Sequence, residues 1–77
     1  MDRGEIADCL ARALTRAEGH VAQGDRLVRK QLEIIETLRC AGCDTTAALE
    51  LLKIFEQTQS TLIADRTRVL ARSKQGD

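Results

Sequence analysis

The stretch that decides the fold is Cys40-Ala41-Gly42-Cys43-Asp44-Thr45-Thr46, near the middle of a chain of 77 residues. Gly42 favours the left-handed backbone that closes a helix, and Arg39 places a positive charge in the last turn before it. Asp44 or Thr45 offers a side-chain oxygen to the unpaired N–H groups that begin a second helix. A connection of about three to five residues places two helices side by side and antiparallel.

The residues before the turn repeat apolar positions in alternating steps of four and three, which is typical of a left-handed supercoiled helix. The main seam consists of Ile6, Leu10, Ala13, Ala17, His20, Gly24, Leu27, Gln31, Ile34 and Leu38. A second column of apolar residues seven apart runs beside it, made of Leu14, Val21, Val28 and Ile35. A stripe this wide predicts a helix, about residues 3–39, that is buried against more than one neighbour.

The residues after the turn also have an apolar period of seven. The repeating positions are Ala48, Phe55, Leu62 and Val69, and the stripe is widened by Leu51, Leu52, Ile54, Ile63 and Leu70. We therefore expect one helical hairpin over residues 1–72, with a turn at about 40–44 and a second helix at about 45–72. Residues 73–77 are expected to form a polar, frayed tail.

The width of the first stripe predicts self-association. Two helices that meet along one line leave either the second column or its neighbours across the main seam facing water. A chain this short rarely buries enough core alone, so we expect an all-α, coiled-coil-like, two-helix antiparallel hairpin that assembles as a dimeric four-helix bundle. The predicted interface residues are Leu10, Leu14, Ala17, Val21, Gly24, Leu27, Val28, Gln31, Ile35, Leu38, Phe55, Leu62 and Val69.

The composition argues against several classes of partner. Twelve Lys and Arg equal twelve Asp and Glu, so the formal net charge is zero and we expect neither nucleic acid nor a membrane surface as a partner. Phe55 is the single aromatic residue apart from one His, and Pro is absent, which argues against most β folds and stacking-based nucleic-acid modules. Neither a signal peptide nor a transmembrane stretch is evident, so we expect a cytoplasmic protein with reduced thiols.

Cys40 and Cys43 have a spacing that occurs in metal and redox sites. Two thiolates supply half of a tetrahedral zinc site, and two hairpins meeting at their turns would pool four. Cys43 is also expected near the start of the second helix, where the positive end of the helix dipole would favour a reactive thiolate. The alternative is that both are incidental thiols in a turn. We expect no cofactor and no bound metal, and retain a metal- or thiol-responsive switch as the alternative function.

The remaining polar and small residues are expected to serve packing. Cys9 is interpreted as a small buried hydrophobe near the overhanging start of the longer first helix. His20 is interpreted as a packing or register residue, and Gln31 and Gln59 as one buried polar layer that fixes alignment. No nucleophilic triad, carboxylate pair or phosphate-binding loop is evident, so we predict no enzyme but a non-enzymatic, homo-oligomeric protein-interaction module.

Several short segments of helix and turn follow a pattern found elsewhere. They are Gly19-His20-Val21-Ala22-Gln23-Gly24, Lys30-Gln31, Gly42-Cys43-Asp44-Thr45 and Phe55-Glu56. Together they resemble a group of short proteobacterial proteins of unassigned function, over about residues 15–70. Cys43 stands where that group has His, and Cys40 stands where it has a polar residue. The resemblance implies a helical hairpin and implies no activity.

Overall fold

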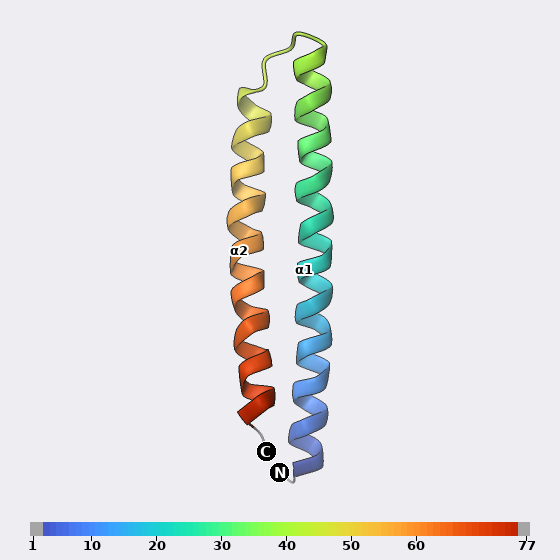
Figure 1. Ribbon diagram of the computed structural model, residues 1–77, viewed down its shortest axis with the longest axis vertical. Helices are drawn as coiled ribbons and strands as arrows, with labels where there is room; N and C mark the ends of the chain where they lie inside the picture. Colours follow the sequence, from blue (N-terminus) through green and yellow to red (C-terminus); the bar gives the residue numbers. More distant parts are fainter. Residues whose placement is uncertain (1–2, 76–77) are drawn as a thin grey trace.

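A computed structural model describes residues 3–75, which form two helices joined by a short turn (Figure 1). Helix α1 spans Arg3–Cys40 and helix α2 spans Thr46–Gln75. The helices run antiparallel and side by side, so that the chain is a rod of 60 × 15 × 14 Å. Residues 3–75 contain no strand. The predicted all-α, two-helix antiparallel hairpin is confirmed.

The helix boundaries differ slightly from those expected. Helix α1 ends at Cys40 and α2 begins at Thr46, each one residue later than expected. Helix α2 also continues through Ser73 and Lys74, so the prediction of a polar tail from residue 73 is wrong for residues 73–75. Arg72 and Lys74 lie in the last turn of α2, where their positive charges interact favourably with the negative end of the helix dipole and stabilise the longer helix. Residues 76–77 of the expected tail lie outside the described part of the chain.

The turn closes α1 through the backbone of Gly42, which has a positive φ of 74°. The N–H of Cys43 donates to the carbonyl of Leu38 at 2.9 Å, and the N–H of Gly42 donates to the carbonyl of Arg39 at 3.1 Å. This pair of bonds is a Schellman motif, which satisfies carbonyls that the end of a helix leaves unpaired. The role predicted for Gly42 is confirmed.

Asp44 caps the beginning of α2. Its Oδ1 accepts a hydrogen bond from the hydroxyl of Thr46 at 2.7 Å and another from the backbone N–H of Thr46 at 3.0 Å. The Thr46 hydroxyl, and then the backbone N–H, lower the pKa of the Asp44 carboxyl below its usual value of 3.8. The carbonyl of Thr45 accepts the first helical bond, from the N–H of Leu49 at 2.9 Å. Of the two predicted capping side chains, Asp44 is the one that bonds.

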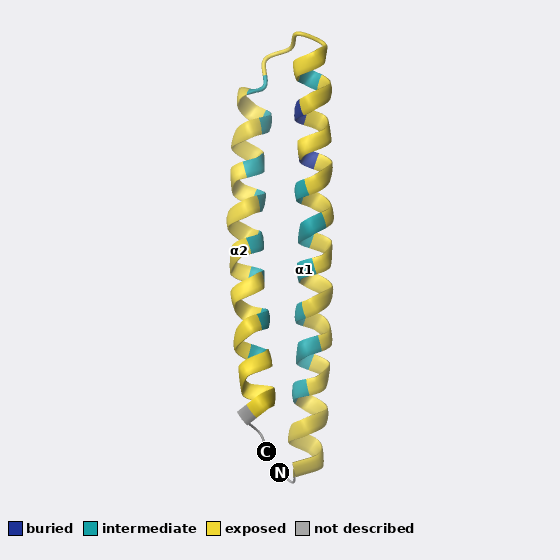
Figure 2. Cartoon of the chain, viewed as in Figure 1, coloured by how far each residue is buried: buried dark blue, intermediate teal, exposed yellow. Residues whose placement is uncertain are grey.

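The hairpin is held together by one seam, which lies where the two helices face each other (Figure 2). Both helices contribute residues in alternating steps of three and four, as in an antiparallel coiled coil. Ile35 and Gln31 are buried, at 3% and 5% exposure. The other α1 members are half-buried: Leu10, Leu14, Ala17, Val21, Gly24, Val28 and Leu38. The half-buried α2 members are Thr45, Ala48, Leu52, Phe55, Gln59, Leu62, Arg66 and Val69.

The seam decides which part of the wide stripe is left outside. The second column contributes Ile35 to the buried centre and Val21 and Val28 to the half-buried seam, so this column faces α2 within its own chain. Its neighbours Leu27 and Ile34 remain 44% and 41% exposed. The sequence left open whether the second column or its neighbours across the main seam would face water. In the structure, the neighbours Leu27 and Ile34 face water.

Candidate functional site

Two long faces flank the seam, and both carry exposed apolar side chains. In an antiparallel helix pair, the residues next to the seam on one side of each helix share a face. We call the first the His20 face, which comprises Ile6, Ala13, His20, Leu27, Ile34, Leu51, Ile54, Thr58 and Asp65. We call the second the Asp25 face, which comprises Glu18, Asp25, Leu32, Leu49, Glu56, Ile63 and Leu70.

The two faces differ in charge. On the His20 face, Asp65 is the one charged residue of the nine, and Leu51 and Ile54 of α2 are 41% and 55% exposed, whereas three of the seven residues of the Asp25 face are acids. On the Asp25 face, Asp25 and Glu56 line the same hollow. The His20 face is therefore the one that loses less favourable hydration when another apolar surface covers it.

A groove of about 300 Å³ opens on the His20 face near its middle. Its lining residues are His20, Gln23, Gly24, Leu27, Phe55, Thr58 and Leu62. A second hollow of about 290 Å³ adjoins it toward the open end of the hairpin, and His20 lines both. Arg16 and Asp65 lie in this second hollow, so the face becomes charged in that direction.

The floor of the groove depends on Gly24. A Cβ at this position would overlap Oε1 of Gln59 and would lie 2.9 Å from Cδ of Gln59 and 3.4 Å from Cδ1 of Leu62. The missing side chain lets the Gln59 amide cross to α1, where its Nε2 donates to the carbonyl of Val21 at 2.9 Å. The Gln59 Oε1 is buried and has no hydrogen-bond partner.

Gln31 makes a similar cross-link in the opposite direction. Its Nε2 donates to the carbonyl of Ala48 on α2 at 2.9 Å. Because Gln59 bonds at Val21, the two glutamines lie in separate layers of the seam, and the prediction that they form one layer is wrong. Each amide instead bonds to the backbone of the facing helix, and together the two bonds set the register of the hairpin.

Most of the predicted interface residues serve the seam inside one chain. Of the thirteen residues predicted, only Leu27 is exposed, although Gly24, Phe55 and Leu62 also line the groove. Ile34, Leu51 and Ile54 are exposed on this face and are not among the thirteen predicted interface residues. The seven-residue spacing of Ile6, Leu27 and Ile34 in the sequence could have indicated that they share one exposed face.

The cysteines lie apart from this surface. Cys40 and Cys43 are both exposed at the turn, and Sγ of Cys40 lies 3.7 Å from Oε1 of Glu36 as a weak donor. Cys9 is exposed as well, so its interpretation as a buried residue is wrong: Leu10 next to it is half-buried in the seam, whereas Cys9 lies on the outer side of α1 with Arg12. No cluster of three or more His, Cys, Asp or Glu side chains in residues 3–75 is arranged to hold a metal ion.

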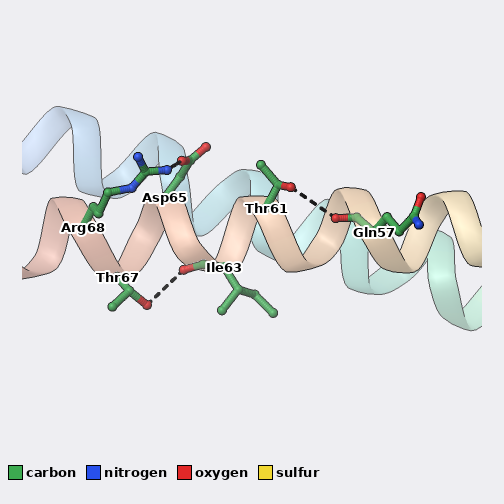
Figure 3. A network of polar contacts seen from close by, with 6 residues as sticks. All are labelled: Gln57, Thr61, Ile63, Asp65, Thr67 and Arg68. Atoms are coloured by element: carbon green, nitrogen blue, oxygen red, sulfur yellow. Dashed lines mark hydrogen bonds and ion pairs between the residues drawn. The ribbon is translucent and has the colours of Figure 1, made fainter.

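The polar contacts at the outside of α2 are local (Figure 3). Thr61 and Thr67 donate to the carbonyls four residues earlier, at 3.2 and 3.0 Å, and Arg68 pairs with Asp65 one turn away. The ion pair stabilises α2 by a small amount, whereas Thr bonds to the carbonyl four residues earlier do not stabilise a helix, and none of these contacts reaches α1. They leave half of the Asp65 side chain exposed.

Comparisons with known proteins do not indicate what this surface binds. No family model, no curated protein and no solved structure matches the chain. The resemblance to short proteobacterial proteins stays a prediction. Among the described residues, neither helix has an apolar run long enough to span a bilayer.

Proposed function

We propose that this protein is a non-enzymatic helical interaction module that works as a homo-oligomer, in which two hairpins pack into a four-helix bundle. The observation that carries the proposal is the surface that one hairpin exposes. The accessible surface is 6074 Å² for a chain of 8.5 kDa. A compact monomer of this mass exposes about 4,700 Å², so the hairpin has about 1,400 Å² in excess.

The small core supports the same conclusion. Ile35, at 3% exposure, is the only apolar residue that is buried in the described part of the chain, whereas Leu27 and Leu49 are 44% and 48% exposed. Ordering the backbone costs about 1–2 kcal/mol per residue, which a single narrow seam offsets poorly. A second chain would supply the missing burial.

The charge of the chain supports a protein partner in the cytoplasm. With a formal net charge of zero, the chain lacks the overall electrostatic attraction that favours nucleic acids and anionic membranes as partners. Three cysteines without a disulfide suit a reducing compartment.

Sedimentation equilibrium over a micromolar concentration series tests the proposal. We expect a mass of twice 8.5 kDa and a melting temperature that rises with protein concentration. A folded chain that sediments as a monomer throughout the series, with a melting temperature independent of concentration, would overturn it.

A metal- or thiol-responsive switch is the second candidate, because Cys40 and Cys43 are both exposed at the turn. Zinc binding or oxidation at this pair would change how two hairpins meet. Protein purified without oxygen should then contain zinc, or its oligomeric mass should change when the thiols are oxidised. The double substitution Cys40→Ser and Cys43→Ser should abolish the zinc binding or the change in mass. Protein that holds no zinc and keeps its mass on oxidation would exclude this candidate.

A further inference from the structure

The His20 face is divided along the rod into an apolar half and a charged half. The half nearest the turn carries Leu27, Ile34, Leu51 and Ile54, each at least 41% exposed. The hollow nearer the open end is lined in part by Arg16 and Asp65. A partner that covers the whole face must therefore be apolar at one end and charge-complementary at the other.

The register of the hairpin places complementary residues at the same height. The glutamine bonds set Gln31 level with Ala48 and Val21 level with Gln59. Leu27 of α1 lines the groove with Phe55 and Thr58 of α2, so it lies near the level of Ile54. Arg16 lies near the level of Asp65, as their shared hollow shows.

Two symmetric arrangements bring two His20 faces together over their full length. In the parallel arrangement, the two-fold axis runs along the rod, both turns lie at one end, and α1 of each chain packs on α2 of the other. In the antiparallel arrangement, the axis crosses the rod, the turns lie at opposite ends, and each helix packs on its own copy.

The parallel arrangement matches like with like in polarity. At equal height, Leu27 of one chain meets Ile54 of the other. Arg16 has no ion-pair partner among the described residues, and it would meet the open half of the Asp65 carboxylate in the second copy. The antiparallel arrangement would instead set Leu51 and Ile54 against Asp65 and Arg68, which would have to lose water. Two antiparallel chains could avoid this mismatch by sliding along each other until only their apolar halves overlap. The contact would then be about half as long.

The area also fits a second copy. The excess of about 1,400 Å² per chain exceeds the ~800 Å² that each partner buries in a standard interface. One face of a rod of 60 × 15 × 14 Å provides about 800 Å² only when the second copy covers most of its length.

We infer that a second copy of this chain docks on the His20 face in parallel, with both turns at the same end of the bundle. This inference rests on the proposed homo-oligomeric function and adds the face and the orientation. Its Arg16–Asp65 pairs between chains set the alignment, and its Leu27, Leu51 and Ile54 contacts supply the apolar burial. The four turn thiols then lie at one end of the bundle.

Distances between spin labels in the dimer test the orientation. Cys9→Ser with Cys40→Ser leaves Cys43 for labelling at the turn, and Cys40→Ser with Cys43→Ser leaves Cys9 at the other end; all three thiols are exposed. Helices in contact lie 8–10 Å apart, so a parallel dimer predicts distances below about 35 Å for both labels, linkers included. An antiparallel dimer predicts Cys43 distances that approach the 60 Å length of the rod.

The outcomes separate the two proposals. A monomeric mass with no distance between labels refutes the proposed function and the inference together. A dimeric mass with a long Cys43 distance refutes the parallel arrangement only. A short Cys43 distance with a long Cys9 distance means that the turns meet tip to tip, which also refutes it.

Matched substitutions test the face. Leu27→Asp lies on the His20 face, and its control Leu32→Asp lies on the Asp25 face at a similar exposure, 44% against 50%. We expect Leu27→Asp to raise the dimer dissociation constant by more than about tenfold, because a carboxylate would be buried without a partner. Leu32→Asp should leave the constant within about threefold. Equal effects, or the reverse order, would overturn the choice of face. Circular dichroism at high concentration verifies that both variants stay helical.

Discussion

The side-chain amide of Gln59 occupies the space that a side chain at Gly24 would fill, and from there it reaches the backbone of α1. This is a close approach between the helices. It explains why a glycine is retained in the middle of a long helix, where it costs about 1 kcal/mol relative to alanine.

Gly24→Ala should destabilise the protein. The new Cβ would overlap the Gln59 amide and displace it from its bond with Val21. Overpacking of this kind costs about 1–3 kcal/mol and the lost hydrogen bond about 0.5–1.5 kcal/mol, which together exceed the gain of about 1 kcal/mol in helix propensity. Chemical denaturation measures the difference. Gly19→Ala is the control, since nothing lies within 4 Å of a Cβ there, and it should raise stability. A stabilised Gly24→Ala variant would contradict the interlocking of Gln59 and Gly24.

Gln31→Leu should raise the melting temperature and reduce the uniqueness of the assembly. Leucine fills a similar volume in the buried seam, and the Ala48 carbonyl keeps its bond within α2. The loss of the cross-link should allow other registers and a broader distribution of oligomers. Sedimentation velocity measures that distribution, with Gln57→Leu on the exposed side of α2 as the control. A lower melting temperature with one unchanged species would argue against a role in register.

Asp44→Ala should remove a stabilising cap that depends on pH. Because the pKa of this carboxyl is lower in the folded chain than its usual 3.8, its contribution is fully present above that value. The contribution is lost as the pH falls through the lowered pKa. The difference in unfolding free energy between wild type and Asp44→Ala should thus be smaller at acidic pH than at pH 7. Chemical denaturation of both proteins at the two pH values measures this difference. Asp44→Asn keeps the capping geometry and should lie between them at pH 7. A difference that is constant with pH would exclude the carboxylate as its source.

Gly42→Ala should destabilise the turn through the backbone alone. A φ of 74° is left-handed, and a side chain there costs about 1–2 kcal/mol. No atom lies within 4 Å of the position where a Cβ would stand, so the effect reports conformation and not a clash. Gly42→Asn should cost less, because asparagine tolerates this region. Equal stabilities of the alanine variant and the wild type in thermal denaturation would show that the turn has rearranged.

The hairpin and its turn could be predicted because their signals are local. Gly42 and Asp44 act on the backbone within a few residues, and the seven-residue period of α1 needs no knowledge of α2. The division of the wide stripe could not be predicted in the same way. Three adjacent columns are apolar, and only the facing residues of α2 decide that Ile35 turns inward and Ile34 outward.

The glutamine pairing and the position of Cys9 show the same limit. A seven-residue pattern places Gln31 and Gln59 in the seam, but the carbonyls that they reach depend on the register between the helices. Cys9 is exposed although its neighbour Leu10 is half-buried in the seam, because Cys9 lies on a side of α1 that α2 does not cover, beside Arg12 and Arg16. Contacts between distant parts of a chain have to be known before such residues can be assigned.

The buried Oε1 of Gln59, which lacks a hydrogen-bond partner, makes the centre of the rod less protected than the buried layer at Ile35. An entering water molecule would satisfy that oxygen, so local opening costs less free energy here than at Ile35, where a dry apolar contact is broken. Amide protons around Gly24 should exchange with solvent sooner than those near Ile35. Thermal fluctuations would then separate the hairpin from its middle as well as from its open end.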